Sequence, residues 1–342
     1  MPSRPAIVDA LESRRLFASL TPGVTAETAI TTARPNKNWS INLVAGQAVY
    51  IGAGETTPSA LQPLLILIGP NRKTVGRSIG NSGAFMGKVA PLTGTYTVRI
   101  RDTAGTQTGG VRVTAVFTGS TPITDGDDAG VAASGRRFPA SIAPGDLDVW
   151  RINATNVRQF LSLVLNENNN GSAIGVGVAL IGPDGSGLTG SESTTGFALD
   201  VPAARRGTYY AVVYEPGSDA SGRYGFSLGL SPGTQTNEDP DTRTPLSSGQ
   251  NRTGDIPSGD IDLYPVSLAA GRTIRITMSR NNSSVTPEIL IIDPNGNQVA
   301  SASGTSSASL TYTTRQSGTF AVLTRNRDAN TGGGYRLSYS VS

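Results

Sequence analysis

The chain contains one short stretch twice, as Pro-Gly-Asp-Leu-Asp-Val-Trp at Pro144–Trp150 and as Ser-Gly-Asp-Ile-Asp-Leu-Tyr at Ser258–Tyr264. Each copy has a glycine that suits a tight turn, followed by acidic residues that alternate with apolar ones up to a final aromatic residue. Alternation with a period of two is typical of a half-buried β-strand. Each copy therefore predicts a turn followed by a strand, with Trp150 or Tyr264 as its anchor.

Other landmarks recur at the same spacing and predict an internal triplication. A weaker copy of the anchor lies upstream, and each anchor is followed by an apolar run ending in Gly-Pro or Asp-Pro and then by a Gly-Thr-aromatic triplet. Units of about 100 residues are large enough to hold a core of their own. The anchors are Trp39, Trp150 and Tyr264, and the triplets begin at Gly94, Gly207 and Gly318.

Composition and patterning predict an all-β fold. The 342 residues include 42 Gly and 21 Pro, only 15% are charged, and runs with helical spacing are nearly absent. The runs Leu64–Ile68, Val176–Ile181 and Ile289–Ile292 are apolar on both faces, which is typical of central strands in a sandwich. We expect three tandem antiparallel β-sandwiches at residues 21–119, 120–231 and 232–342. Short acidic linkers with Pro or Gly predict a semi-stiff string of beads.

The N-terminal residues 1–20 hold the one convincing helical pattern, at Pro5–Leu20. Within it, Leu11–Ala18 resembles the LEPR-XLL-type leader of bacterial secreted and surface proteins, with Ser13 where that family often has Pro. The resemblance implies export. The alternative is an amphipathic terminal helix that packs on the first sandwich.

Several function classes are excluded or disfavoured by what the chain lacks. It has no Cys and no His, which removes disulfides, thiolate chemistry, the Ser-His-Asp and Cys-His mechanisms and histidine metal sites. The formal charge of +3 and the lack of a basic stripe disfavour nucleic acid as a partner. No run approaches the ~18 apolar residues of a membrane span.

The repeats resemble the bacterial pre-peptidase C-terminal domain. The third unit matches best, with Gly259–Tyr264, Asp293–Gly296, Gly318–Phe320 and Gly334–Leu337 at the positions of that family's motifs. The second unit is nearly as good, and the first keeps only the later half. The resemblance implies an eight-stranded, jelly-roll-like sandwich on a secreted or cell-surface protein. Members usually accompany an enzyme, often a peptidase, whereas this sequence consists of the repeats.

Two groups of carboxylates lie at equivalent places before the second and third units. Clustered carboxylates with intervening carbonyls suit calcium, and related collagen-binding sandwiches bind calcium at such a linker. The alternative is a solvated acidic turn, because no strict calcium-loop spacing is present. No other cofactor is expected. The candidate metal ligands are Asp125, Asp127, Asp128, Glu238, Asp239 and Asp241.

Other polar residues and the two tryptophans are expected to be structural. The paired aspartates of the repeated stretch satisfy turn amides or charge a sheet edge more readily than they form a catalytic pair. Asp102-Thr103-Ala104 resembles half of an aspartic-protease dyad without a partner. Trp39 and Trp150 could belong to a carbohydrate platform, but their anchor positions favour core packing. We therefore expect no catalytic residues.

Two functions of different classes remain. The first is a non-enzymatic extracellular or cell-surface structural or adhesive protein that self-associates into a fibre or surface layer. In this interpretation the first sandwich is short of one strand, and a neighbouring subunit's N-terminal segment fills the open edge. The second is a secreted binding module for polysaccharide or matrix protein, accessory to a separate hydrolase.

Overall fold

A computed structural model describes residues 17–118, 130–167, 174–233 and 246–342, and every regular element in these ranges is a β-strand. The all-β prediction is confirmed. The predicted N-terminal helix is not seen: Ala18–Ser19 forms strand β1, and residues 1–16 lie outside the described ranges. Within those ranges no helix is long and apolar enough to cross a membrane.

The first sandwich pairs two sheets, in the orders β2-β9-β4-β7 and β1-β3-β8-β5-β6. Strand β1 is parallel to β3, and the other pairs in both sheets are antiparallel. The strands are β2 (Ala26–Ile30), β3 (Asn36–Leu43), β4 (Ala48–Glu55), β5 (Pro63–Ile68), β6 (Thr74–Ile79), β7 (Gly83–Val89), β8 (Gly94–Asp102) and β9 (Gly109–Phe117).

The second sandwich repeats this topology, in the orders β10-β17-β12-β15 and β11-β16-β13-β14. Each strand takes the place of the strand eight numbers earlier. The strands are β10 (Arg136–Ile142), β11 (Asp148–Ala154), β12 (Phe160–Glu167), β13 (Val176–Ile181), β14 (Gly187–Ser193), β15 (Gly196–Pro202), β16 (Gly207–Tyr214) and β17 (Gly222–Ser231).

The third sandwich has the orders β18-β25-β20-β23 and β19-β24-β21-β22, so all three units share one fold. The strands are β18 (Gln250–Ile256), β19 (Ile261–Leu268), β20 (Thr273–Arg280), β21 (Pro287–Ile292), β22 (Gln298–Ser303), β23 (Ser307–Thr313), β24 (Gly318–Asn326) and β25 (Gly333–Val341).

The first sandwich is not short of a strand, and that expectation is wrong. Strand β2 pairs with β9 over Ala26–Ile30, just as β10 pairs with β17 and β18 with β25. The segment Ala18–Ser19 also pairs with β3 of the same chain. The strand position proposed for a neighbouring subunit is therefore filled from within the chain.

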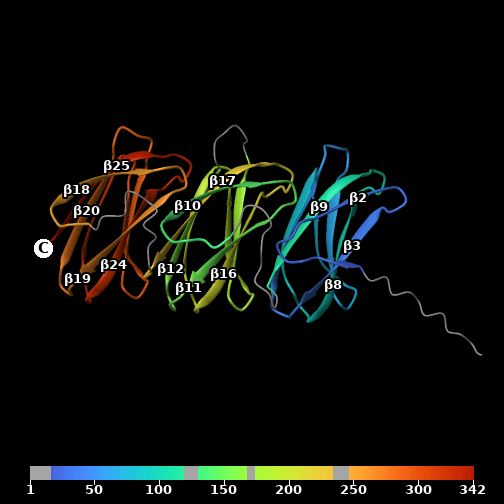
Figure 1. Cartoon of the computed structure of the whole chain (residues 1–342), viewed down its shortest axis with the longest axis horizontal. Helices are drawn as coiled ribbons and strands as arrows, with labels where there is room; N and C mark the ends of the chain where they lie inside the picture. Colours follow the sequence, from blue (N-terminus) through green and yellow to red (C-terminus); the bar gives the residue numbers. More distant parts are fainter. Residues whose placement is uncertain (1–16, 119–129, 168–173, 234–245) are drawn as a thin grey trace, which may run out of the picture.

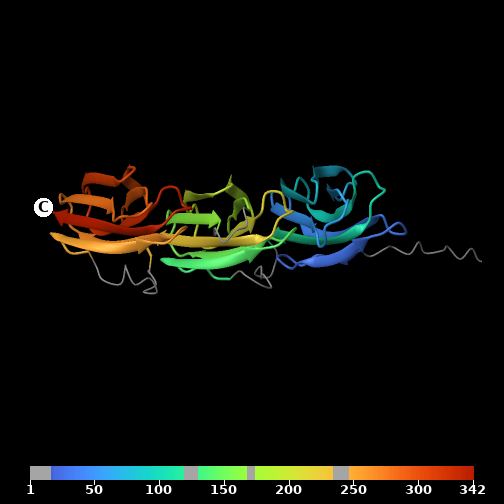
Figure 2. The same cartoon turned by 90° about the horizontal axis from the view of Figure 1, so that it is seen from above.

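Each sandwich holds one apolar core between its two sheets. The anchors Trp39, Trp150 and Tyr264 lie in these three cores, which confirms their predicted packing role. The sandwiches follow one another in a single elongated row, with the first sandwich at one end and the C-terminus at the other (Figures 1 and 2).

Candidate functional site

The repeated stretch buries both of its faces, and one of them faces the neighbouring sandwich. Leu147 and Val149 are 0% and 1% exposed, yet they do not belong to the core of the second sandwich. They form a separate apolar cluster with Val116, Tyr50 and Phe85 of the first sandwich. Each such side chain, when fully buried, contributes about 1.5–3 kcal/mol. The alternation thus marks an interface between domains as well as a strand.

Glycines of the first sandwich let the turn of the second approach closely. A Cβ on Gly54 would lie 2.5 Å from the backbone nitrogen of Gly145 and would also meet the carbonyl oxygen of Ser218. A Cβ on Gly83 would meet the same carbonyl. Gly145 itself has a φ of 73°, which an L side chain rarely adopts. Backbone therefore packs against backbone at this joint.

Polar and aromatic contacts fix the orientation of this first joint. The carboxylate of Asp146 accepts a hydrogen bond from the hydroxyl of Thr25 at 3.1 Å, across the two sandwiches. The ring of Phe85 stacks on that of Tyr214, with centroids 3.9 Å apart. The hydroxyl of Tyr214 in turn donates to Glu192 at 2.7 Å. These directional contacts select one docking geometry.

The joint between the second and third sandwiches repeats the arrangement. Ile261 and Leu263, equivalent to Leu147 and Val149, cluster with Phe160 and other residues of the second sandwich. The turn that precedes them is held by its own hydrogen bonds: the side chain of Arg137 donates to the carbonyl of Ser258 at 2.8 Å, and Asn166 donates to the Ser258 hydroxyl at 2.6 Å. The same turn motif is therefore the docking element at both joints.

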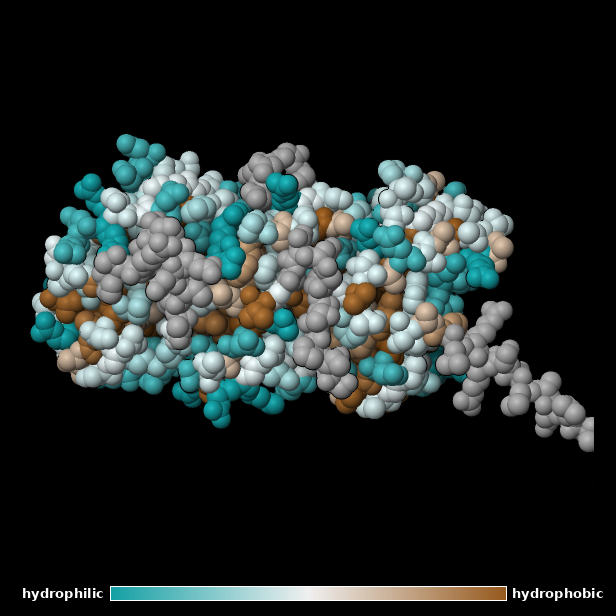
Figure 3. Space-filling model, viewed as in Figure 1, coloured by the Kyte–Doolittle hydropathy of each residue, from teal (hydrophilic) through white to brown (hydrophobic). Residues whose placement is uncertain are grey.

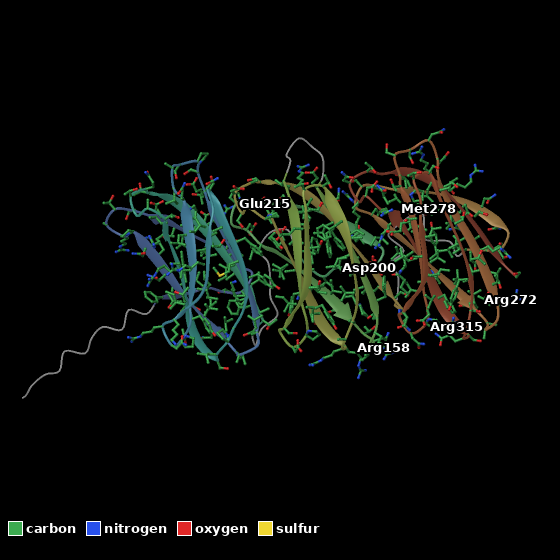
Figure 4. The ribbon with its side chains drawn as sticks, turned by 180° about the vertical axis from the view of Figure 1, so that it is seen from behind. Arg158, Asp200, Glu215, Arg272, Met278 and Arg315 are labelled. Atoms are coloured by element: carbon green, nitrogen blue, oxygen red, sulfur yellow. The ribbon has the colours of Figure 1, made fainter. Side chains whose placement is uncertain are left out.

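A buried ion pair network crosses the second joint. The side chain of Arg325, on β24, is 6% exposed and lies 2.8 Å from the carboxylate of Asp200, on β15. It also contacts Glu288 at 2.7 Å and donates to the hydroxyl of Ser162 at 2.8 Å. Although burial lowers it, these two carboxylates raise the pKa of Arg325 overall. Asp200 lies beside the boundary between the second and third sandwiches (Figure 4).

The six sheets form one continuous stack with five apolar layers. Three layers are the sandwich cores, and the other two are the interface clusters described above. On the face seen in Figure 3, hydrophilic residues cover much of the two long rims. The sandwiches are not independent beads on a string, because each packs on the next through buried apolar side chains and hydrogen bonds.

The second aspartate of the repeated stretch points into the sandwich and binds a tyrosine. Asp148 is fully buried and accepts a hydrogen bond from the hydroxyl of Tyr224 at 2.5 Å. In the third sandwich Tyr335 donates to Asp262 in the same way and is also bonded to the hydroxyl of Tyr264. These two aspartates are therefore not charges on an exposed sheet edge.

Replacing Tyr335 by phenylalanine is expected to destabilise the chain by about 1–3 kcal/mol, because a buried carboxylate loses a donor. Burial, and then Asp262, raise the pKa of Tyr335. The folded phenol therefore stays protonated above the ordinary pKa of about 10. The Tyr335 hydroxyl therefore contributes its full stabilisation below pH ~10, and this stabilisation is lost as the pH rises further. The phenylalanine variant has no phenol at this position, so its free energy of unfolding should fall less over the same pH range.

Chemical denaturation as a function of pH measures this effect. Tyr339→Phe is the matched control, because Tyr339 lies on the same strand face, is 4% exposed, and has a hydroxyl without a hydrogen bond in the described structure. An equal loss in both variants would contradict a specific role for the pair.

The predicted metal ligands cannot be placed. Asp125, Asp127, Asp128, Glu238, Asp239 and Asp241 all lie outside the described residues. Within the described ranges no three acidic residues come together in a way that could hold a metal ion.

Asp102 has a structural role. It is 2% exposed and accepts hydrogen bonds from the backbone N–H groups of Gln62, Thr106 and Gln107, at 3.0–3.2 Å. Burial raises the pKa of this carboxyl, but the backbone donors outweigh it and lower the pKa overall. It closes the loops at one end of the first sandwich.

A polar pocket of about 480 Å³ lies at the first joint, lined by Glu55, Arg112 and Asp219 among others. Two of its charged groups are engaged locally. Glu55 accepts hydrogen bonds from the backbone N–H and the hydroxyl of Ser59, and Arg112 forms an ion pair with Glu27 at 2.7 Å. Glu215 lies beside the same boundary (Figure 4). These contacts fit a structural joint.

The outer side of the sheet that contains β3, β8, β5 and β6 forms a basic end face, which was not predicted from the sequence. Residues 17–118 include nine Lys and Arg but only three Asp and Glu, whereas residues 130–233 include seven and eight. A count of charge for each predicted domain would have revealed this asymmetry, which the small net charge of the whole chain conceals.

No protein-family model matches the chain, and no curated protein matches it. Among solved structures, it is similar to the pre-peptidase C-terminal domain of a collagenase from Bacillus anthracis, with 16% identity over 32% of this chain and 100% of the other, at a TM-score of 0.26. The periplasmic inhibitor of g-type lysozyme from Aeromonas hydrophila gives 12% identity over 29% and 95%, at 0.25. A triple jelly-roll protein of an archaeal virus gives 9% identity over 90% and 81%, at 0.22. Likenesses of this size say nothing about function.

Proposed function

We propose that the chain is a non-enzymatic structural protein of the cell surface or extracellular space, in which three jelly-roll-like sandwiches of the pre-peptidase C-terminal type form one stiff rod. The observation that carries this proposal is the pair of interface clusters that join the three cores into a single stack. A rod of stacked sheets holds its two ends at a fixed distance and orientation, which suits a spacer or scaffold. The LEPR-XLL-like leader supports export.

Small-angle X-ray scattering on the full chain tests the stiff rod. We expect one distance distribution that fits the end-to-end row of Figure 1, unchanged between low and high salt, because the joints are mainly apolar. A scattering curve that requires an ensemble of bent conformations would contradict the proposal.

Self-assembly into a fibre stays a prediction. We do not expect two chains to assemble by stacking the sheet at one end on the sheet at the other. The outer face of the last sheet, which contains β20 and β25, carries Arg275, Thr277 and Arg336. At the two joints, by contrast, the outward side chains of a sheet are covered by the neighbouring sandwich. We infer that this polar face is not a stacking surface, like the polar outer faces of terminal repeats in stacked proteins. Sedimentation with and without millimolar calcium tests both self-assembly and the predicted calcium sites.

A binding module for polysaccharide is the second candidate. The basic end face of the first sandwich specifically favours it.

A further inference from the structure

The outer face of the end sheet in the first sandwich is organised in cross-strand rows. One row runs from Asn38 on β3 to Arg99 on β8, Ile66 on β5 and Arg77 on β6. The next row places Asn36 beside Arg101. Adjacent strands lie about 4.8 Å apart, so the backbones of Arg77 and Arg99, two strands apart, are about 10 Å from each other. The face therefore presents three guanidinium groups and several side-chain amides together.

The positions of Asn38 and Arg99 are apolar in the other two sandwiches. Counting from the aromatic anchors, Asn38 corresponds to Val149 and Leu263. Counting from the Gly-Thr-aromatic triplets, Arg99 corresponds to Val212 and Leu323. Those side chains are buried against a neighbouring sandwich. The first sandwich has thus replaced a stacking surface by a charged one.

Preventing further stacking does not by itself require positive charge. The opposite end of the rod is capped mainly by hydroxyl groups, which bond to one another in the cross-strand pairs Thr273–Thr313, Thr277–Ser309 and Ser279–Ser307. That face has two arginines, Arg275 and Arg336, and carries Asp255 as well. The stronger charge of the first end therefore points to a function beyond capping.

The arginines of the first end face are not neutralised within the described structure. Arg77, Arg99 and Arg101 form no ion pair with any described acidic residue, and the outer positions of strands β3, β5, β6 and β8 include no Asp or Glu. Arg99 donates to the side-chain carbonyl of Asn38 at 2.8 Å, which fixes its guanidinium over the sheet. A cluster of like charges held in place creates a positive potential that attracts an anion.

A pocket of about 730 Å³ adjoins this face. Its lining includes Phe17, Arg34, Lys37, Asn38 and Arg99. Arg99 thus belongs both to the sheet face and to the pocket, so a long ligand could extend from one to the other. The pocket adds two further cationic side chains and one apolar ring to the surface, and Asn38 belongs to both.

We propose that this basic end face binds an acidic polysaccharide. Arginine recognises carboxylate or sulfate groups with paired hydrogen bonds, and the amides of Asn36 and Asn38 suit sugar hydroxyls. Nucleic acid fits less well, because sheet surfaces that bind single strands stack bases on aromatic rings. Here the rings of Trp39 and Tyr96 are buried in the core behind the sheet, and among the described residues the single ring of Phe17 lies beside the face. The proposal does not rest on the stiffness of the rod.

Affinity electrophoresis of the full chain through gels that contain alginate, a polyuronate, tests this site. Neutral dextran and a single-stranded thymidine oligonucleotide serve as comparison ligands. We expect alginate at about 50 mM salt to retard the chain, dextran to leave it unaffected, and the affinity to fall steeply as salt is raised. The double variant Arg77→Gln with Arg99→Gln should bind alginate at least ~10-fold more weakly and with a shallower salt dependence.

The double variant Arg275→Gln with Arg336→Gln is the matched control, since it removes two charges from the sheet face at the other end. It should bind alginate within about twofold of the unaltered chain, because only local charges contribute at this salt. Arg77→Gln alone, at an exposed position, covers the case in which the first double variant fails to fold. An equal loss in the control, no retardation by alginate, or tighter binding of the oligonucleotide through Arg77 and Arg99 would overturn the proposal.

Discussion

Replacing Gly54 by valine is expected to separate the first and second sandwiches while leaving each of them folded. The new side chain would collide with backbone atoms of Gly145 and Ser218, which cannot rotate away as a side chain can. The three atoms nearest to the added Cβ all belong to the second sandwich. We therefore expect an undocked first sandwich to accept valine on β4, because valine is a good strand former. The joint must therefore open or distort.

The expected loss is about 3 kcal/mol. Overpacking a tight contact costs about 1–3 kcal/mol and more when backbone must move. Opening the joint instead exposes Leu147 and Val149, each of which contributes about 1.5–3 kcal/mol when buried. Calorimetry should show the single unfolding transition split in two, and scattering should show bending at one joint.

Gly130→Ala is the control for this prediction. Gly130 lies beside the same joint in the sequence, but a Cβ there would meet nothing within 4 Å. It should leave both the scattering curve and the unfolding transition unchanged. If Gly54→Val behaved like this control, the backbone-on-backbone docking described above would be wrong.

Much of the architecture could be predicted because it is repeated. The alternation in the stretch that ends at Trp150, the Gly-Thr-aromatic triplet and the apolar runs each recur in three units, so local patterns reinforced one another. The sequence did not show, however, what covers each face of a strand. An alternating strand shows that Leu147 and Val149 lie on one side, but the pattern is the same whether a core or a neighbouring sandwich covers that side.

The burial of the second aspartate in the repeated stretch could not be predicted either. An acidic residue in an alternating strand normally indicates a solvated face, yet Asp148 is buried because Tyr224, 76 residues later, supplies a hydrogen bond. The basic end face could not be predicted for a related reason. Arg77, Arg99 and Arg101 lie on two different strands and are brought together only by the pairing of the sheet.

The second large effect is expected from Arg325→Met, which removes the cation of the buried network at the other joint. Methionine fills a similar volume, but it leaves the carboxylates of Asp200 and Glu288 without their partner in a site where their side chains are only 24% and 20% exposed. Breaking a buried ion pair in this way costs about 3–5 kcal/mol. Denaturant unfolding of the full chain measures the loss.

Arg327→Met is the matched control, because Arg327 is exposed and two residues away on the same chain segment; its loss should stay below about 0.5 kcal/mol. A double-mutant cycle between Arg325→Met and Asp200→Asn then isolates the contact across the joint. Arg325 belongs to the third sandwich and Asp200 to the second. A coupling energy above about 1.5 kcal/mol between them therefore arises only if the two sandwiches are docked in solution. If the two losses simply add, the ion pair does not span the joint, and the rod is hinged at its second junction.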